Sequence, residues 1–285
     1  MPSRKYARLT VPIVQSLWLS AGFAAYSALT LLKPYPPFSY VPEIPLALDA
    51  VTSFALALLI AFRVNRAYER WWEGRTLWGK LVNVSRNLAI KIRELPRVPS
   101  EDKARMRDLI VAFCRGLKDH LRDDPELRRL PGFERDFEQP GHLPSYIVRH
   151  IYEKFAKWDD EQHVRAEQLW ILDSEARWLM EICGACERIK NTLMPISWRW
   201  ITWKAIVLYL LILPWGLVDN FGWWTIPLTM LATYFSVTAE VVARHVEEPF
   251  GADEDQLDLK GLCEVIDRSV SEVLREPGSG RATRD

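Results

Sequence analysis

Three large apolar side chains recur every fourth residue in the first quarter of the chain. Phe54, Leu58 and Phe62 lie at i, i+4 and i+8, so on a helix they form one stripe. Such stripes most often serve helix packing. Several copies arranged around an axis would instead form a hydrophobic constriction that gates ion flow by dewetting. The stripe therefore predicts either a packing surface or the neck of a pore.

An acidic run between residues 247 and 258 is the second group with chemical potential. Calcium is a hard ion that takes several carboxylate or carbonyl oxygens, and a turn containing glycine can supply them. The candidate ligands are Glu247, Glu248, Asp253, Glu254 and Asp255. The spacing is not that of an EF-hand loop. The alternative is a solvated acidic turn that caps the next helix.

Histidine and cysteine patterns argue against an enzyme. The five histidines are scattered, at His120, His142, His150, His163 and His245. The chain has no H-E-x-x-H, G-x-S-x-G, P-loop or G-x-G-x-x-G motif. Cys183 and Cys186 form a C-x-x-C pair inside a helical pattern, with no second pair nearby in sequence, which favours packing over redox chemistry or zinc binding. We expect no catalytic residues and no metal centre.

Charge is strongly segregated along the chain. The 285 residues carry 37 basic and 37 acidic side chains, so net charge does not argue for nucleic acid. The mean hydropathy of −0.09 looks soluble. However, 27 of the 37 Lys and Arg residues lie between Arg63 and Lys204, and apolar runs flank this block on both sides. This segregation indicates a membrane protein with a large water-facing part.

Four apolar runs are candidate membrane spans. They are residues 9–32, 44–62, 205–218 and 221–239. The first has 24 residues without a charge, which is ample for a spanning helix. Asp49 interrupts the second, and the third has only 14 residues but follows Trp198, Trp200 and Trp203, as at a membrane interface. Short or charged spans persist where protein or a water-filled cavity surrounds them, which favours a pore or a transporter.

The block between the apolar pairs has apolar positions at three- and four-residue spacing, which predicts amphipathic helices. The series are Trp71, Gly74, Trp78, Leu81, Ser85, Leu88 and Ile92; Met106, Ile110, Phe113, Leu117 and Leu121; and Leu169, Leu172, Ala176, Leu179, Cys183 and Cys186. Residues 123–144 are rich in Pro, Gly and charge and predict a loop. Residues 219–222 predict a tight turn, and no segment alternates like a strand.

Basic residues set the predicted orientation. One side has only short loops with Lys33, whereas the other has Arg4, Lys5, Arg8 and the basic block, so the second side is cytoplasmic. We predict a multi-pass protein of the inner (plasma) membrane with both termini cytoplasmic. Its segments are 1–62 (transmembrane helices 1 and 2), 63–204 (cytoplasmic helical domain), 205–243 (transmembrane helices 3 and 4), 244–276 (cytoplasmic helical segment) and 277–285 (disordered tail).

Several motifs in order resemble the bestrophin family of pentameric ion channels, and most closely its short bacterial branch. They are Phe62-Arg63, Arg70-Trp71-Trp72-Glu73, Arg75, Leu77-Trp78-Gly79, Val82-Asn83, Ser85-Arg86-Asn87-Leu88-Ala89, Cys186-Glu187-Arg188-Ile189, Pro195 and Glu248-Pro249-Phe250-Gly251. The resemblance extends from about residue 11 to about residue 273. It implies an all-α homopentamer with four transmembrane helices per subunit, a large cytoplasmic helical domain and a central pore.

The resemblance also assigns residues. It places Phe54, Leu58 and Phe62 at the pore neck and Met194, before Pro195, at a cytosolic aperture. The string Thr192-Leu193-Met194-Pro195 departs from the Thr-Pro-Ile-Pro-like string of the family. The alternative is an ordinary helix-ending proline after a flexible side chain. In animal bestrophins the acidic string after Pro-Phe-Gly belongs to a calcium clasp, whereas bacterial members are not known to need calcium.

The expected function is passive conduction of monovalent ions. The family implies chloride or other anions, although a bacterial member prefers cations, and apolar constrictions carry no charge that would decide the sign. The expected partners are other copies of the chain, the lipid bilayer and the permeant ions, without nucleic acid. One alternative is a secondary transporter, which predicts inverted repeats that the two helix pairs do not show. The other is a membrane-anchored scaffold, which would tolerate changes along the stripe.

Overall fold

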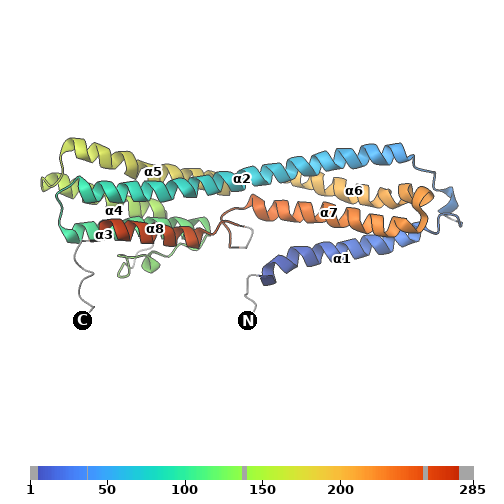
Figure 1. The fold of residues 1–285 in the computed structure, drawn as a ribbon, viewed down its shortest axis with the longest axis horizontal. Coiled ribbons are helices and arrows are strands. Elements are labelled where there is room, and N and C mark those ends of the chain that lie inside the picture. The colour runs from blue at the N-terminus through green and yellow to red at the C-terminus, as the bar shows by residue number, and fades with distance from the viewer. Residues whose placement is uncertain (1–5, 37, 137–139, 253–255, 276–285) are drawn as a thin grey trace. The chain divides into compact units, whose positions relative to one another are not determined.

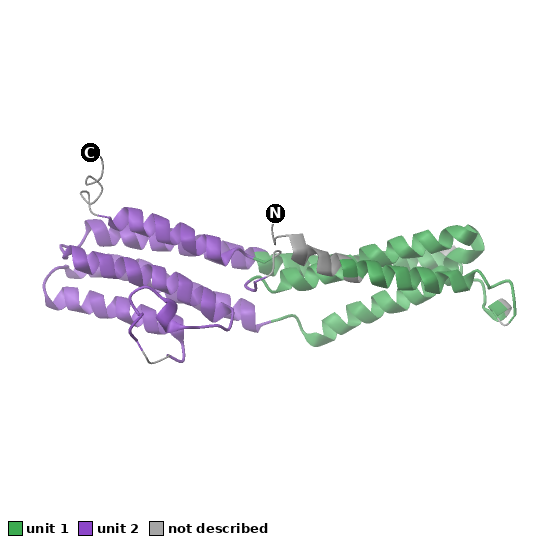
Figure 2. Ribbon diagram, turned by 90° about the horizontal axis from the view of Figure 1, so that it is seen from below, with its two compact units in different colours: residues 1–71, 193–249, 253–256 green, residues 72–192, 250–252, 257–285 purple. Residues whose placement is uncertain are grey.

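The prediction of an all-α fold is confirmed. The computed structural model describes residues 6–36, 38–136, 140–252 and 256–275, and within these residues the regular elements are all helices. The chain forms two compact units (Figures 1 and 2). Unit 1 comprises residues 1–71, 193–249 and 253–256, and unit 2 comprises residues 72–192, 250–252 and 257–285. The predicted tail, 277–285, lies outside the described residues.

One long helix, α2 (Leu46–Glu94), contributes to both units. The sequence changes from apolar to charged at Arg63 without a helix breaker, and the helix continues through that point. Unit 1 also contains α1 (Tyr6–Thr30), α6 (Ile196–Phe221) and α7 (Thr225–Glu247). Helix α7 packs along both α1 and α6 (Figure 1). Between the helices lie two short 3-10 turns, Phe38–Tyr40 and Gly222–Trp224.

Small hydroxyl side chains lie on the buried faces of α1 and α7. The buried hydroxyl residues are Ser16, Ser20, Ser27 and Thr30 on α1 and Thr225, Thr229 and Thr233 on α7. Several of these hydroxyls donate to a carbonyl of the preceding helical turn, for example Ser20 Oγ to the carbonyl of Ser16 at 2.7 Å. Small side chains let two helix backbones approach closely, which is how helices pack where lipid removes the hydrophobic driving force.

The turn between the last two apolar runs agrees with the prediction at one residue. We expected a tight turn at residues 219–222, but α6 continues to Phe221 and the chain leaves the helix only at Gly222, whose φ is +50°. A left-handed backbone conformation suits glycine because it has no Cβ. Asp219 and Asn220 alone do not break the helix. Asp219 instead forms an ion pair with Lys33, from the segment after α1.

Unit 2 is a helical bundle with a largely apolar core. It contains the second part of α2, α3 (Ser100–Leu121), α4 (Leu143–Asp160), α5 (Ala166–Asn191) and α8 (Leu259–Leu274). Helix α3 packs against α4, α5 and α8. The three predicted series are confirmed: all their positions are buried except Trp71 and Leu169, which are half-buried. Among the described residues of the predicted loop, 123–144, the one regular element before α4 begins at Leu143 is the 3-10 turn Leu127–Arg129.

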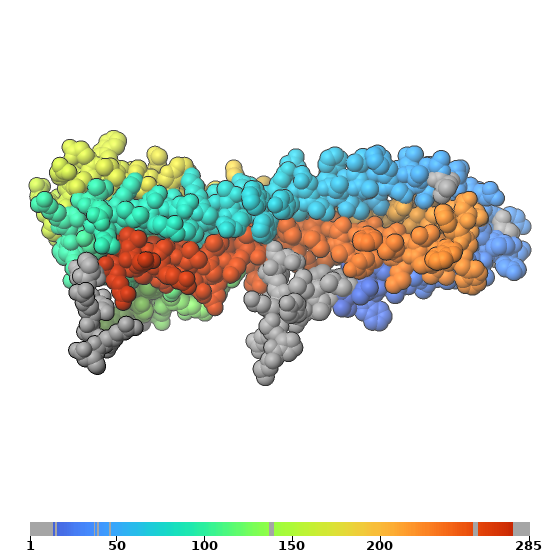
Figure 3. All heavy atoms as spheres, in the orientation of Figure 1, coloured from blue at the N-terminus to red at the C-terminus, as the bar shows by residue number. Residues whose placement is uncertain are grey.

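Much apolar surface stays uncovered within a single chain. Two helical stretches, Ala47–Glu94 and Ile196–Glu247, are apolar and long enough to cross a membrane by length and composition, and the second includes both α6 and α7. Only 17% and 39% of their most apolar windows are buried. The apolar part of α2 lies along the outside of unit 1 (Figure 3). A surface of this kind needs lipid or another subunit to cover it.

Two tryptophans of unit 2 provide a matched test of its core. Trp78 on α2 is fully buried, whereas Trp170 on α5 is exposed. We expect Trp78→Ala to lower the free energy of unfolding by about 3–5 kcal/mol, because it leaves a large cavity. Trp170→Ala should change it by less than about 0.5 kcal/mol. Thermal unfolding of the purified protein in detergent measures both, and equal shifts would contradict this description of the core.

Candidate pore helix and buried ion-pair cluster

The stripe of Phe54, Leu58 and Phe62 is exposed on α2. Their exposed fractions in the single chain are 66%, 44% and 62%. Within the part of unit 1 that the structure describes, none of the three belongs to the buried cluster that holds α2 in place. The stripe is therefore available to another molecule. Whether it faces a pore stays a prediction.

The opposite face of α2 packs against α6. Leu56 is buried among apolar side chains of that helix, which are Ile206, Leu210, Leu213 and Leu217. Seven residues further along α2 is Arg63, and an interval of seven is close to two turns of about 3.6 residues each. Leu56 and Arg63 thus share the inner face. This places the exposed stripe on the other side of the helix.

Arg63 is a fully buried arginine at the point where the sequence of α2 becomes charged. Its Nη2 lies 2.6 Å from Oε2 of Glu247, and its Nε lies 3.5 Å from Oε2 of Glu240. Both carboxylates come from α7 and are themselves buried. The other oxygen of Glu240 accepts from Nε of Arg244 at 3.1 Å. The buried guanidinium of Arg63 therefore has carboxylate partners, as a buried charge requires, and the exposed Arg244 offsets part of the charge of Glu240.

Met194 connects to the same cluster. Its backbone N–H donates to Oε1 of Glu247 at 3.0 Å, and its sulfur lies 3.7 Å from Nη1 of Arg63. Nε of Arg70, two turns after Arg63, donates to the backbone carbonyl of Glu247 at 3.1 Å. The segment that carries the predicted aperture residue is therefore attached to the helix that carries the predicted neck, through one glutamate. Met194 is half-buried at this position.

The acidic run divides into parts with different roles. Both carboxylate oxygens of Glu247 are occupied, one by Arg63 and one by the Met194 N–H, whereas Glu248 is exposed. Asp258, the last acid of the run, caps α8 by accepting from the Gly261 N–H at 2.9 Å. Asp253, Glu254 and Asp255 lie outside the described residues. Calcium binding stays a prediction, and Glu247 would have to leave Arg63 to take part in it.

The C-x-x-C pair lies in the core of unit 2. Cys183 and Cys186 are both buried on α5 and are free thiols. Burial raises the pKa of Cys183 to about 12 and raises that of Cys186 further. Neither thiol therefore forms a thiolate near neutral pH, and the thiolate is the reactive form. The pair acts as small apolar core residues.

Sequence reasoning did not identify the ion-pair cluster. Arg63 was identified only as the first residue of the basic block and as part of the Phe62-Arg63 motif, and Glu240 directly follows the fourth apolar run. One signal was available: Glu240 and Glu247 are seven residues apart, so they share a face of α7. Two carboxylates on one face of a helix that packs inside an apolar unit require a positively charged partner.

Removing Glu247 should destabilise unit 1 because it leaves Arg63 buried without its nearest carboxylate. Breaking a buried pair from one side costs about 3–5 kcal/mol, and Glu240 at 3.5 Å offsets part of this, so we expect about 3 kcal/mol for Glu247→Ala. The exposed neighbour provides the control, and Glu248→Ala should have little effect. The readout is the thermal unfolding midpoint in detergent.

The double variant Arg63→Met/Glu247→Leu separates a lost ion pair from lost packing. Replacing a buried pair by apolar residues of similar size is often neutral, so it should recover much of the stability. Equal destabilisation by Glu247→Ala and Glu248→Ala would contradict the assigned role of Glu247.

Comparison with known proteins places this architecture in one family. Residues 6–272 match the profile of the bacterial and fungal bestrophin proteins. A voltage-dependent anion channel-forming protein of Mesorhizobium japonicum is 31% identical over 267 residues, covering 90% of this chain and 84% of the relative. One from a Nostoc strain is 30% identical over 242 residues, covering 80% and 78%.

Solved structures share the fold. A bacterial bestrophin homologue from Klebsiella pneumoniae superposes with a TM-score of 0.84 at 22% identity, covering 93% of this chain and all of the other. The family profile spans nearly the whole chain, in agreement with the motifs around Arg63 and Pro249. This chain is a member of the bacterial and fungal bestrophin family.

Proposed function

We propose that this chain is the subunit of a homopentameric membrane channel that conducts monovalent ions passively through a central pore. The observation that carries the proposal is the exposed stripe on α2. Three large apolar side chains lie on the face of a helix whose other face is anchored by Leu56 and Arg63. Family membership and the channel names of its relatives support transport rather than catalysis.

The neck of the proposed pore consists of Phe54, Leu58 and Phe62 from each subunit. Rings of these side chains would form a narrow apolar passage, where water leaves easily and ion flow stops. Because Arg63 is paired with α7, α2 cannot rotate freely, and the stripe keeps a fixed direction. A constriction needs this fixed geometry, since small rotations would change its width.

The second constriction is assigned to Met194. Its attachment to Glu247 gives a physical route by which the neck and the aperture can move together. A shift of α2 at Arg63 would pull on Glu247, and Glu247 holds the backbone of Met194. We therefore propose that the two constrictions are mechanically coupled through this glutamate.

The ion is proposed to be an anion, with chloride as the simplest case. The relatives are named voltage-dependent anion channel-forming proteins, which supports this choice. The proposed constrictions contribute no charge of their own, so cation conduction stays the alternative. We place the protein in the inner (plasma) membrane as a multi-pass protein with both termini cytoplasmic, which follows from its distribution of basic residues.

Shortening a neck side chain should raise the single-channel conductance. Phe62→Ala widens the proposed constriction and lowers its dewetting barrier, so we expect a conductance at least about twofold higher in planar bilayers. Phe235 on α7 has the same exposed fraction, 62%, and provides the control because it lies on a different helix. Phe235→Ala should leave the conductance unchanged.

The outcome also distinguishes the alternatives. Unchanged conductance in Phe62→Ala would remove this residue from the neck. If Phe62→Ala and Phe235→Ala both keep the normal ion flux, and this flux saturates with ion concentration, a transporter would be favoured instead.

A further inference from the structure

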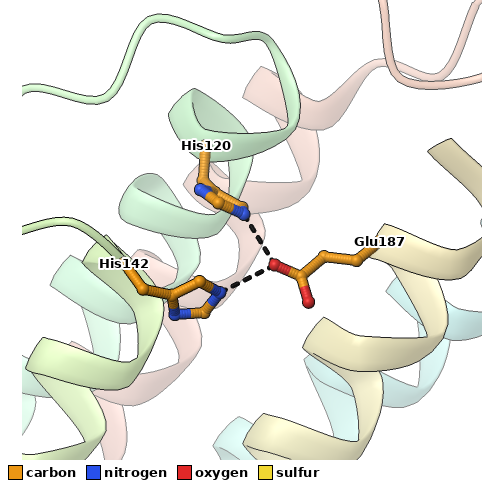
Figure 4. A group of neighbouring side chains, drawn as sticks. All are labelled: His120, His142 and Glu187. Carbon is orange, nitrogen blue, oxygen red and sulfur yellow. Dashed lines mark hydrogen bonds and ion pairs between the residues drawn. The ribbon is translucent and has the colours of Figure 1, made fainter. Parts of the chain in front are cut away.

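Two histidines and a glutamate from three different elements of unit 2 meet at one point (Figure 4). His120 lies near the end of α3, His142 is the residue that precedes α4, and Glu187 lies on α5. Their ligand atoms all lie within 4.8 Å of one another. The five histidines are scattered in the sequence, and the fold rather than the spacing brings two of them together with Glu187.

The three side chains converge on one oxygen. Nε2 of His120 and Nε2 of His142 each lie 2.7 Å from Oε1 of Glu187. The two imidazole rings are edge to face, with centroids 4.8 Å apart. All three residues are partly exposed, so an ion from solution can reach them. The second oxygen of Glu187 points away from the histidines in Figure 4.

The charge around the cluster favours a cation. Burial would raise the pKa of Glu187, but the hydrogen bonds from His142 and His120 outweigh it and lower the pKa. Glu187 is therefore a carboxylate near neutral pH. The neighbouring Lys190 is already paired with Asp123, and Arg188 with Glu73. Neither of these positive side chains forms the ion pair with Glu187 that a bound cation would replace.

We propose that His120, His142 and Glu187 form a binding site for a divalent transition metal ion, with zinc as the best fit. Two imidazole nitrogens and one carboxylate are a ligand set that zinc uses when it keeps further positions open for water. Calcium and magnesium prefer oxygen ligands throughout, so two nitrogens disfavour them. The site is independent of the proposed pore residues.

Zinc must displace a proton from His142. Its Nδ1 accepts from the Ser145 N–H at 3.1 Å, which leaves the neutral ring with its proton on Nε2. To bind zinc through Nε2, the ring moves this proton to Nδ1 and gives up the cap. His120, which also donates from Nε2 to the carboxylate, moves its proton to Nδ1 in the same way. Loss of a helix cap weakens binding by about fivefold. Each coordination bond to a metal contributes more than this, so the metal prevails.

Zinc binding would tie three elements together. His120 and His142 are at opposite ends of the connection between α3 and α4, and Glu187 adds α5. A bound ion therefore closes that connection and stabilises unit 2, because a ligand that binds only the folded state shifts the folding equilibrium.

The test is calorimetric titration of ZnCl2 into the full-length protein in detergent, after metal removal with a chelator. We expect one zinc per subunit. Glu187→Gln and His120→Ala should each weaken it more than about 100-fold, since even loss of an outer hydrogen-bond partner costs about 10- to 100-fold. His150 forms the same kind of histidine–carboxylate pair, with Glu153 alone at 2.7 Å, and His150→Ala should bind zinc normally.

If a variant fails to fold, absorption spectroscopy of the unaltered protein with Co²⁺ still tests the proposed site. Co²⁺ should give visible d–d absorption bands that zinc abolishes. Absence of these bands, or zinc affinity that is unchanged in Glu187→Gln and His120→Ala, would overturn the proposal. So would loss of binding in Cys183→Ser/Cys186→Ser with the cluster intact, because that result would assign the metal to the thiols.

Discussion

Arg63 is a charged side chain with no exposed surface, and the arrangement of unit 1 follows from that constraint. A buried guanidinium needs carboxylate partners, and α7 supplies Glu240 and Glu247. These ion pairs fix the rotation of α2 about its own axis. Leu56, seven residues before Arg63, fixes this rotation a second time by packing against α6. Both contacts leave the stripe of Phe54, Leu58 and Phe62 on the outer face. The direction of the proposed pore lining is thus set by an interaction on the opposite side of the helix.

The same glutamate gives the two proposed constrictions a common support. One carboxylate oxygen of Glu247 accepts from Arg63 and the other accepts from the backbone N–H of Met194. A displacement of Arg63 would therefore also displace Met194. The apolar surface left bare on α2, α6 and α7 fits a subunit that is completed by lipid and by further copies. One chain cannot cover this apolar surface. The proposed pentamer, which agrees with family membership, would cover part of it.

Local pattern predicted much of this fold. The three series of apolar positions matched the buried faces of α2, α3 and α5, because a helical period records burial directly in the sequence. Contacts between distant residues left no such record. Arg63 and Glu247 are 184 residues apart, and His120, His142 and Glu187 come from separate elements, so only the packing of helices reveals them. Of the predicted turn at residues 219–222, only Gly222 leaves the helix, because its left-handed backbone ends α6, whereas Asp219 and Asn220 remain helical.

The reversal potential of purified protein in a planar bilayer under a salt gradient tests the central claim most directly. The account predicts stable single-channel currents that reverse near the equilibrium potential of chloride. Currents that reverse near the potential of the cation would keep the pore and correct the ion. Absence of current from folded, pentameric protein under all conditions would contradict the assignment of a pore to this chain.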